Sequence, residues 1–403
     1  MEDIILTEKQ QEALELAVQR YNQHKPYTCI SGYAGSGKST LVSFIIQALN
    51  LPPYDVCFIS YTGKAALVLQ EKGNLNSMTA HRLLYQSYPR RDGTFFHMPR
   101  RPLEYPYKLI VVDEVSMLPK DMWDLLLSHH IHVIALGDPG QLPPLNEPNG
   151  VLDHPHVFLD EIMRQAQESE IIRVSMDIRE GKPLHKFKGS EVQIIDPYEV
   201  TSGMLQWANQ IIVAKNSTRH FYNDLMRTYI FGDHTDEPME GDKVICLRND
   251  WDTITPLGDV LVNGLTGYLE NIVYTDNNRI NVVPKKYIKT FMSADFLPDH
   301  YAPESDAIIY GDGVFTDLNL DYKLFTTHEP TVTKENFRRI PQVLQPHQFD
   351  YGYAITAHKS QGSEWDKVLV FEEDFPWGED HKRWLYTAVT RARQKLVIVR
   401  KQP

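Results

Sequence analysis

The segment at residues 32–39 constrains this chain more than any other part of it. It reads Gly-Tyr-Ala-Gly-Ser-Gly-Lys-Ser, a complete G-x-x-x-x-G-K-[ST] pattern between a strand-like run at residues 28–31 and a helical stretch at residues 41–49. Glycines let the backbone N–H groups of such a loop turn toward a phosphate, and the helix that follows adds the positive end of its dipole. We therefore predict a nucleotide-binding loop made by Gly35, Ser36, Gly37, Lys38 and Ser39.

Strand-like and helix-like stretches alternate along the first third of the chain. Short apolar runs at residues 28–31, 56–60, 109–112 and 133–136 are mostly separated by segments of helix length. This alternation predicts an α/β fold with a parallel sheet. With 403 residues, of which 42% are hydrophobic, the chain is long enough for two or three compact units and apolar enough to bury a core in each. Disordered and low-complexity classes are excluded.

Two acidic residues end the apolar run at residues 109–112. An acidic pair at the end of a strand is usually only a solvated turn, but a phosphate-binding loop earlier in the chain changes its meaning. Asp113 is predicted to hold Mg²⁺ together with Ser39, and Glu114 to polarise the water that attacks the γ-phosphate. The two patterns together favour hydrolysis of a nucleoside triphosphate over mere binding.

Three further polar residues complete the predicted chemistry. Gln141 follows the run at residues 133–136 and is expected to sense the γ-phosphate or the attacking water. Arg164 and Arg391 are candidates for stabilising the negative charge that develops on the γ-phosphate oxygens. The predicted catalytic set is therefore Lys38, Glu114, Gln141, Arg164 and Arg391.

The charge of the chain bears on nucleic acid as a partner. Its formal net charge is −12, so a nucleic-acid site must be locally basic. Between residues 82 and 108, six Lys or Arg stand against two acids, and aromatic residues that include Phe95 and Phe96 lie among them around Asp92-Gly93. This pattern predicts a β-hairpin that binds single strands by phosphate contacts and base stacking. The alternative, aromatic residues that pack on one another and arginines that are only solvated, stays open.

Cysteine usage and the amino terminus indicate the compartment. Cys29, Cys57 and Cys246 are far apart and form no C-x-x-C pair, which argues against disulfides and a structural zinc site. The start has no basic region followed by an apolar one, and no apolar run reaches the length of a membrane span. We expect a soluble cytoplasmic protein with no membrane partner. Histidines outside the motifs show no spacing with acids or cysteines that predicts a metal site.

The ordered set of motifs resembles superfamily 1 helicases of the B branch, the RecD and Dda group. The resemblance covers nearly the whole chain and rests on residues 6–10, 32–40, 61–66, 79–84, 113–114, 137–144, 164–165, 357–366 and 386–393. It implies that Gln10 reads adenine and that Thr40, Gly362 and Glu364 belong to the nucleotide site. The DNA-binding residues that it implies are Thr62, Lys64, Thr79, His81, His358 and Lys359, with Phe95 or Phe96 at the tip of a pin.

The same resemblance implies a domain plan. The first RecA-like P-loop domain takes residues 1–84 and 108–155, with a parallel sheet and a β-hairpin insertion at residues 85–107. The second RecA-like domain takes residues 156–250 and 346–403, with a small SH3-like all-β insertion at residues 251–345.

The implied activity is ATP-dependent DNA unwinding. The resemblance predicts a monomeric helicase or translocase that moves 5′ to 3′ on single-stranded DNA and at duplex junctions, with ATP and Mg²⁺ between two RecA-like domains. Replication, recombination or single-strand-binding proteins are candidate partners, and a nucleoid or phage-encoded role in a host cytoplasm fits. Three alternatives stay open: a translocase that displaces proteins with little unwinding, a P-loop switch that is not a motor, and an RNA substrate.

Overall fold

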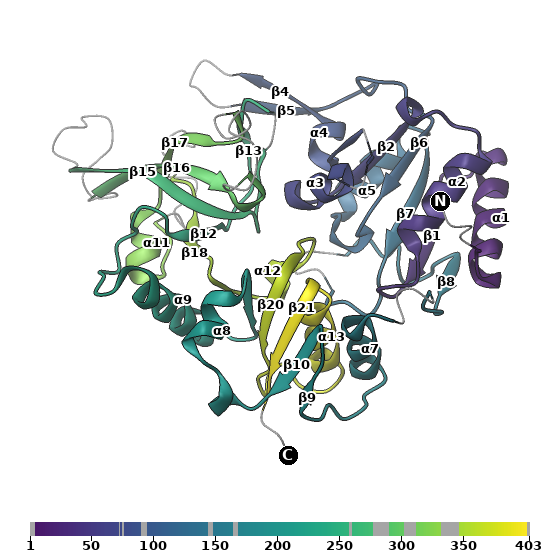
Figure 1. The fold of residues 1–403 in the computed structure, drawn as a ribbon. Coiled ribbons are helices and arrows are strands. Elements are labelled where there is room, and N and C mark those ends of the chain that lie inside the picture. Colours follow the sequence, from purple (N-terminus) through teal and green to yellow (C-terminus); the bar gives the residue numbers. More distant parts are fainter. Residues whose placement is uncertain are drawn as a thin grey trace. The chain divides into compact units, whose positions relative to one another are not determined.

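The computed structural model describes residues 5–71, 73–74, 76–89, 95–143, 148–163, 168–257, 260–276, 290–301, 312–331 and 346–400. The chain divides into two compact units. The first takes Met1–Gln86, Pro99–Lys215 and Thr356–Pro403, and the second takes Ser87–Met98 and Asn216–Ile355. The first unit contains two largely parallel sheets, whereas the sheets of the second are small or antiparallel (Figure 1).

The first sheet of unit 1 has six strands in the order β3-β2-β6-β7-β1-β8, and every neighbouring pair is parallel. The four apolar runs predicted as strands are confirmed, two of them with one extra residue at each end. The strands are β1 (Tyr27–Gly32), β2 (Val56–Ser60), β3 (Ser77–Thr79), β6 (Leu109–Val112), β7 (His132–Gly137) and β8 (Val157–Leu159).

Each buried strand of this sheet feeds two cores, because successive side chains point to opposite faces. In β6, Ile110 and Val112 pack with α4 (Ala80–Leu84) and α5 (Lys120–Leu127), whereas Leu109 and Val111 pack with α1 (Glu8–Asn22) and α2 (Lys38–Ala48). Figure 1 shows α1 and α2 on one side of the sheet and α3 (Gly63–Glu71), α4 and α5 on the other. Helices on both faces explain why the strands are continuous apolar runs.

The second sheet of unit 1 has the order β19-β11-β20-β21-β10-β9. Strands β11, β20, β21 and β10 are parallel to their neighbours among these four, and the short β9 is antiparallel to β10 at the edge. The strands are β9 (Phe187–Lys188), β10 (Val192–Ile195), β11 (Gln210–Val213), β19 (Ala354–Thr356), β20 (Trp365–Phe371) and β21 (Ala392–Val399). The helices are α7 (Glu170–Arg179), α8 (Ser202–Trp207), α12 (Ala357–Ser360) and α13 (Glu379–Val389), and α7 packs on α13.

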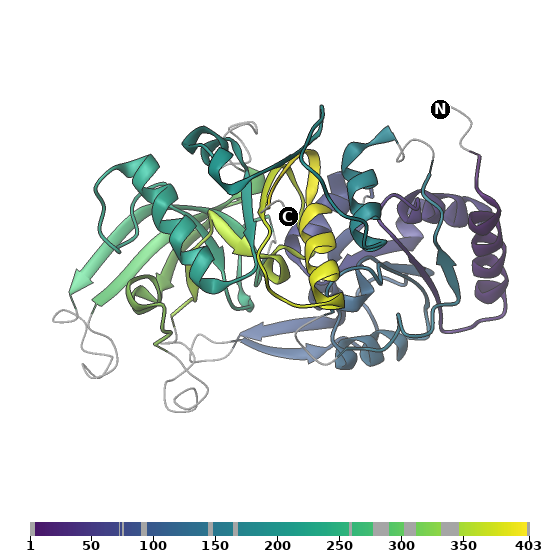
Figure 2. The ribbon, with the colours of Figure 1, turned by 90° about the horizontal axis from the view of Figure 1, so that it is seen from below.

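The predicted hairpin is present as a two-stranded sheet of β4 (Tyr85–Pro89) and β5 (Phe95–Pro99), the pair of blue arrows in Figure 2. Residues 90–94, which include Arg90, Arg91 and the Asp92-Gly93 pair, lie outside the described residues. Most of the hairpin groups with the second unit rather than with the first sheet.

The main sheet of unit 2 has five strands in the order β17-β16-β15-β12-β18, and its four neighbouring pairs are antiparallel. These strands are β12 (Lys243–Cys246), β15 (Thr266–Asp276), β16 (Thr290–Pro298), β17 (Phe315–Leu320) and β18 (Phe349–Tyr351), and β13 (Asp250–Ile254) pairs separately with β14 (Val260–Leu261). The sheet therefore extends beyond the expected range of 251–345. Its strands β12 and β18 lie before and after this range, and they pair with each other.

Helices α9 (Asn216–Phe231) and α11 (Tyr322–Thr327) complete the second unit. Short 3₁₀ helices lie in both units at Pro53–Asp55, Val115–Met117, Pro197–Glu199 and Asp299–Tyr301. In the described part of the chain, no helix has both the length and the apolar character needed to cross a membrane.

Candidate functional site

The predicted phosphate loop joins β1 to α2. Gly35 and Gly37 both have φ of 77°, the left-handed region that glycine adopts without a steric penalty. The loop ends at Lys38, the first residue of α2, whose Nζ donates to the carbonyl oxygens of Gly32 at 2.6 Å and Tyr33 at 2.9 Å. The ammonium group is thus held within the loop, next to the helix N-terminus where an anion is most stable.

One buried hydroxyl tests whether the loop fits a phosphate. Ser36 is 1% exposed, and its Oγ has no hydrogen-bond partner among the described residues. Such a group costs about 1–3 kcal/mol unless a ligand satisfies it. Ser39 is exposed and Thr40 partly buried in the first turn of α2. The donors of the loop therefore suit a phosphate group, and an exposed Ser39 hydroxyl is available to Mg²⁺.

The side chain of Gln10 forms hydrogen bonds within the protein. The carboxamide accepts a hydrogen bond from the Thr7 N–H at 3.0 Å, which closes a capping box at the start of α1. Its Nε2 donates to the Ser36 carbonyl at 2.9 Å. Gln10 therefore supports the phosphate loop from behind, and its expected contact with adenine stays a prediction.

Glu114 lies beyond the end of β6 in a backbone conformation that is rare outside glycine, with φ of 52°. Gln141 Nε2 donates to Glu114 Oε1 at 3.1 Å, and Asp113 Oδ1 accepts the Glu114 N–H at 3.1 Å. Burial raises the pKa of the Glu114 carboxyl, and the charge of Asp113 adds to this, whereas Arg391 and the bond from Gln141 act in the opposite direction. A carboxyl with a raised pKa suits a proton acceptor.

Arg391 lies just beyond the end of α13 and is 4% exposed. Its three guanidinium nitrogens donate to the Thr387 carbonyl, the Ser363 carbonyl and Thr390 Oγ1 at 3.0–3.2 Å. Arg391 is close enough to Glu114 to lower the pKa of that carboxyl. The other predicted arginine, Arg164, lies outside the described residues.

The loop at residues 138–142, which carries Gln141, is held by side chains from the second sheet. Thr387 Oγ1 accepts the Leu142 N–H at 2.8 Å, and Gln361 Nε2 donates to the Leu142 carbonyl at 2.7 Å. Both side chains are almost fully buried. The backbone on either side of Leu142 is therefore tied to the motifs at residues 357–366 and 386–393.

Two further predicted nucleotide residues precede β20. Gly362 has φ of 72°, and a Cβ there would lie 3.0 Å from Thr62 Oγ1, so this glycine allows a close approach to the start of α3. Glu364 is partly buried. Pro144, the last residue of the motif at residues 137–144, lies outside the described residues.

The predicted DNA-binding residues divide into two groups. Thr62 and Thr79 are buried, and their hydroxyls accept the Ala65 and Arg82 N–H groups at the starts of α3 and α4. His81 is 7% exposed and stacks on Tyr85 with ring centroids 4.7 Å apart. These three therefore have structural roles in this conformation.

The second group is less enclosed. His358 and Lys359 are partly buried on α12, and burial lowers the pKa of His358, which favours the neutral imidazole. Phe95 and Phe96 begin β5 and Lys64 lies in α3, but their side chains lie outside the described part of the structure. Their DNA contacts stay predictions.

The structure adds residues that sequence reasoning missed. Tyr386 of α13 hydrogen-bonds to Asp138 and to the Ala34 N–H. Arg179, at the end of α7, lies over the ring of Tyr33 in the phosphate loop. Tyr386 belongs to a recognised motif and could have been noticed as a buried tyrosine, whereas no pattern around Arg179 marks it.

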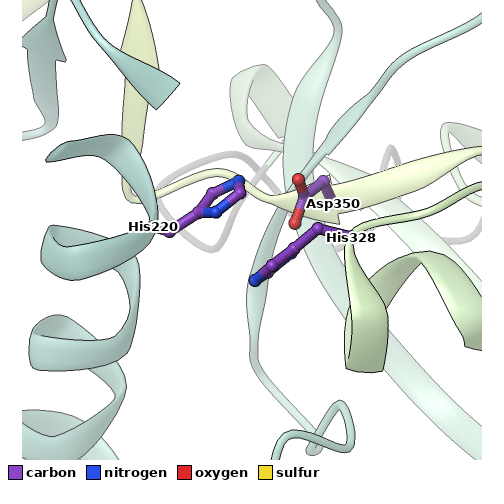
Figure 3. Close-up of side chains that lie close together, drawn as sticks. All are labelled: His220, His328 and Asp350. Carbon is purple, nitrogen blue, oxygen red and sulfur yellow. The ribbon is translucent and has the colours of Figure 1, made fainter. Parts of the chain in front are cut away.

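A separate polar cluster lies in the second unit (Figure 3). His220 of α9, His328 after α11 and Asp350 of β18 place possible metal-ligating atoms within 4.8 Å of one another. Arg219 already engages them, because its Nη1 donates to Asp350 at 2.7 Å and its Nη2 lies 2.5 Å from His220 Nε2. The two imidazole rings stack 3.7 Å apart. A guanidinium thus stands where a metal ion would bind, and we interpret the cluster as an ion-pair and stacking group.

Two sequence families match this chain. The AAA domain family matches residues 5–194, and the UvrD-like helicase C-terminal domain family matches residues 351–399. These segments contain the phosphate loop and Glu114 in the first case, and Gln361 and Arg391 in the second.

Individual relatives extend the match over nearly the whole chain. The chain is 22% identical over 98% of its length to the ATP-dependent DNA helicase dda of Enterobacteria phage T4, of which it covers 99%. It is 25% identical over 91% of its length to the ATP-dependent RecD2 DNA helicase of Deinococcus radiodurans, of which it covers 46%. The crystal structure of the Pif1 helicase from Candida albicans has the same fold, with a TM-score of 0.50, 18% identity and coverage of 99% of this chain and 95% of that one.

The fold is thus α/β, with two RecA-like domains that have parallel sheets, and with antiparallel inserted sheets. The ordered motifs, the two family matches and the two sequence relatives together show that the chain belongs to the B branch of superfamily 1 helicases, the RecD and Dda group.

Proposed function

We propose that this chain is an ATP-dependent DNA helicase that moves 5′ to 3′ along single-stranded DNA and separates duplex ahead of it. The observation that carries the proposal is the hold of the second sheet on the loop at residues 138–142 through Thr387 and Gln361. A motor requires two RecA-like domains that respond to the same nucleotide, whereas a nucleotide switch does not require the second domain. The direction of movement rests on family resemblance.

The residues of the first unit supply the parts that phosphoryl transfer to water requires. Lys38 neutralises charge on the β and γ phosphates, and Glu114, oriented by Gln141, accepts a proton from the attacking water. Arg391 and Arg164 stabilise charge on the γ-phosphate oxygens. Ser39 and Asp113 would hold Mg²⁺, which supplies further positive charge at the phosphates when bound.

Strand grip is assigned to the hairpin and to the turns that carry Lys64, His358 and Lys359. The hairpin is the locally basic, aromatic segment of an acidic chain, and such a surface binds backbone phosphates and stacks on bases without sequence preference. Phe95 and Phe96 are proposed to act at the duplex junction. The relative dda carries the name of an ATP-dependent DNA helicase, which supports DNA as the substrate.

The first experiment measures steady-state ATP hydrolysis with no polynucleotide, single-stranded DNA, duplex DNA and single-stranded RNA. We expect strong stimulation by single-stranded DNA, with Lys38→Ala as the inactive blank. Glu114→Gln should also abolish hydrolysis while strand binding is kept. Indifference to all three polynucleotides would favour a nucleotide switch, and equal stimulation by RNA would broaden the substrate.

Unwinding is tested with duplexes that carry a 5′ or a 3′ tail. The double variant Phe95→Ala with Phe96→Ala should lose more unwinding than ATP hydrolysis, whereas Met98→Ala, an exposed residue of the same strand, should change neither. Equal loss of both activities in the phenylalanine variant would indicate a folding role for the hairpin. Displacement of bound protein without strand separation would favour the translocase alternative.

A further inference from the structure

A guanidinium from the second sheet's helix layer lies against the phosphate loop. Arg179 ends α7, and its Cζ is 3.8 Å from the centroid of the Tyr33 ring. Tyr33 is the second residue of the phosphate loop, directly after Gly32. Its ring is held at the edges by Phe158 at 5.1 Å and Tyr386 at 6.5 Å between ring centroids. Arg179 is therefore placed by a packed aromatic group beside the nucleotide site.

The hydrogen-bond capacity of this guanidinium is only partly used. Arg179 Nη1 is buried and has no hydrogen-bond partner in the described part of the chain. Its Nη2 lies 3.8 Å from a carboxylate oxygen of Glu180, which is too long for a hydrogen bond. Arginine stays charged and carries five N–H donors, so a buried nitrogen without an acceptor is unfavourable until an anion reaches it.

A purely structural role explains only half of this arrangement. Stacking on Tyr33 accounts for the face of the guanidinium, because a cation is attracted to an aromatic face. It does not account for the edge, where Nη1 is buried without an acceptor. In the same loop, Ser36 Oγ is also buried without a partner. The unsatisfied nitrogen of Arg179 borders the phosphate loop through Tyr33, and an anionic group bound at the loop would supply the acceptor that it lacks.

We propose that Arg179 binds the terminal phosphate of the nucleoside triphosphate and so distinguishes ATP from ADP. The proposal rests on the nucleotide site of the proposed function and adds to it a residue outside the recognised motifs. Guanidinium groups bind phosphate oxygens by charge-assisted hydrogen bonds, which are stronger than neutral ones. Because Arg179 belongs to a helix that packs on α13, the contact would also link the γ-phosphate to the second sheet.

The test compares the binding of a non-hydrolysable ATP analogue and of ADP, each with Mg²⁺, by isothermal titration calorimetry on the full chain. Arg179→Met keeps an apolar side chain over Tyr33 and removes every donor. We expect its affinity for the ATP analogue to fall on the order of 10- to 100-fold, the loss of one hydrogen bond to a charged group. Its affinity for ADP should change less than about threefold, since a terminal phosphate contact is absent in ADP.

Arg173→Met is the matched control, because Arg173 is an exposed arginine of the same helix. It should bind both nucleotides as the unmodified protein does. Arg179→Lys, which keeps a point charge, should fall between the unmodified protein and Arg179→Met. It also keeps the test decisive if the Met variant unfolds at a lower temperature.

Two results would overturn the proposal. Unchanged binding of the ATP analogue by Arg179→Met would show that the guanidinium does not contact phosphate. Equal losses for ATP analogue and ADP would show that Arg179 acts only on the shape of the loop. If the unmodified protein binds the ATP analogue but does not unwind DNA, the proposed function fails, and the comparison with Arg179→Met still decides the assignment of Arg179. If it binds neither nucleotide, both fail.

Discussion

The hydroxyl group of Tyr386 donates a hydrogen bond to a carboxylate oxygen of Asp138 at 2.7 Å. The hydroxyl oxygen of Tyr386 also accepts a hydrogen bond from the Ala34 N–H at 2.8 Å. One side chain of α13 thus joins the phosphate loop to the loop that carries Gln141. Burial raises the pKa of Tyr386 well above its usual value, so the group stays a neutral hydroxyl and can donate and accept at once. A shift of α13 would therefore reach both loops together.

Tyr386→Phe should separate this link from the rest of the site. The change removes both hydrogen bonds and leaves the Asp138 carboxylate and the Ala34 N–H without this partner, while the ring is kept. We expect kcat for ATP hydrolysis to fall about tenfold, from the loss of buried hydrogen bonds that place Gln141. Tyr198→Phe, at a tyrosine that is 82% exposed, is the control. An unchanged kcat would refute the link.

The pH dependence of hydrolysis should report Glu114. A proton acceptor must be ionised, so kcat should rise with pH through the raised pKa of this carboxyl. The hydrogen bond from Gln141 favours the charged form and lowers that pKa. Gln141→Ala should therefore move the acidic limb of the kcat profile to higher pH. A limb at the same pH in both proteins would show that another group controls it.

Gly37→Ala should abolish nucleotide binding for two reasons that can be separated. Its φ of 77° disfavours any side chain, and a Cβ would lie 2.5 Å from Gln10 Nε2 and 2.7 Å from Met163 Sδ. Gly73 has φ of 90° with no atom within 4 Å of the added Cβ, so Gly73→Ala measures the backbone cost alone, about 1–2 kcal/mol of stability. Nucleotide titration of both variants is the measurement. If Gly37→Ala still binds nucleotide, the contacts of the added Cβ with Gln10 and Met163 do not disturb the phosphate loop.

The hydrogen bonds of Glu170 at the start of α7 should contribute to the stability of the protein. Glu170 accepts backbone N–H groups of Ser190, Glu191 and Val192 at 2.7–3.1 Å, and these bonds lower the pKa of its carboxyl to about 2. The ionised carboxylate therefore contributes to the free energy of unfolding. This contribution is complete above the pKa of the unfolded state, near 4.3, and disappears as pH falls toward 2. Glu170→Gln should cost roughly 1–2 kcal/mol at pH 7, after allowance for solvent screening.

Chemical denaturation at several pH values checks this. The difference in unfolding free energy between the unmodified protein and Glu170→Gln should shrink as pH falls from about 4.5 to about 2. Glu168→Gln, at an exposed glutamate just before the helix, is the control and should show no such trend. A difference that does not depend on pH would mean that the ionised carboxylate contributes nothing.

Local patterns predicted much of the first sheet. Residues 109–112 and 56–60 are predicted as strands with the ends that the structure has, because continuous apolar runs of four and five residues match a buried strand and are too short for a buried helix. The phosphate loop is equally local, since Gly37 and Lys38 act within a few residues of their neighbours. The hairpin at residues 85–99 was predicted from its composition. The reach of the inserted sheet was not, because β12 pairs with β18 more than 100 residues later.

The sequence alone therefore determined the kind of chemistry: a phosphate loop, an acidic pair after a buried strand, and the ordered motifs of a helicase branch. These signals are local in the chain, where propensity and spacing operate. Tertiary structure alone decided which groups meet, such as Gln141 with Glu114, Tyr386 with Asp138, and Arg179 with Tyr33. Residues 146 positions apart, as in the last pair, are brought together by the packing of whole helices and sheets, and no spacing in the sequence encodes that distance.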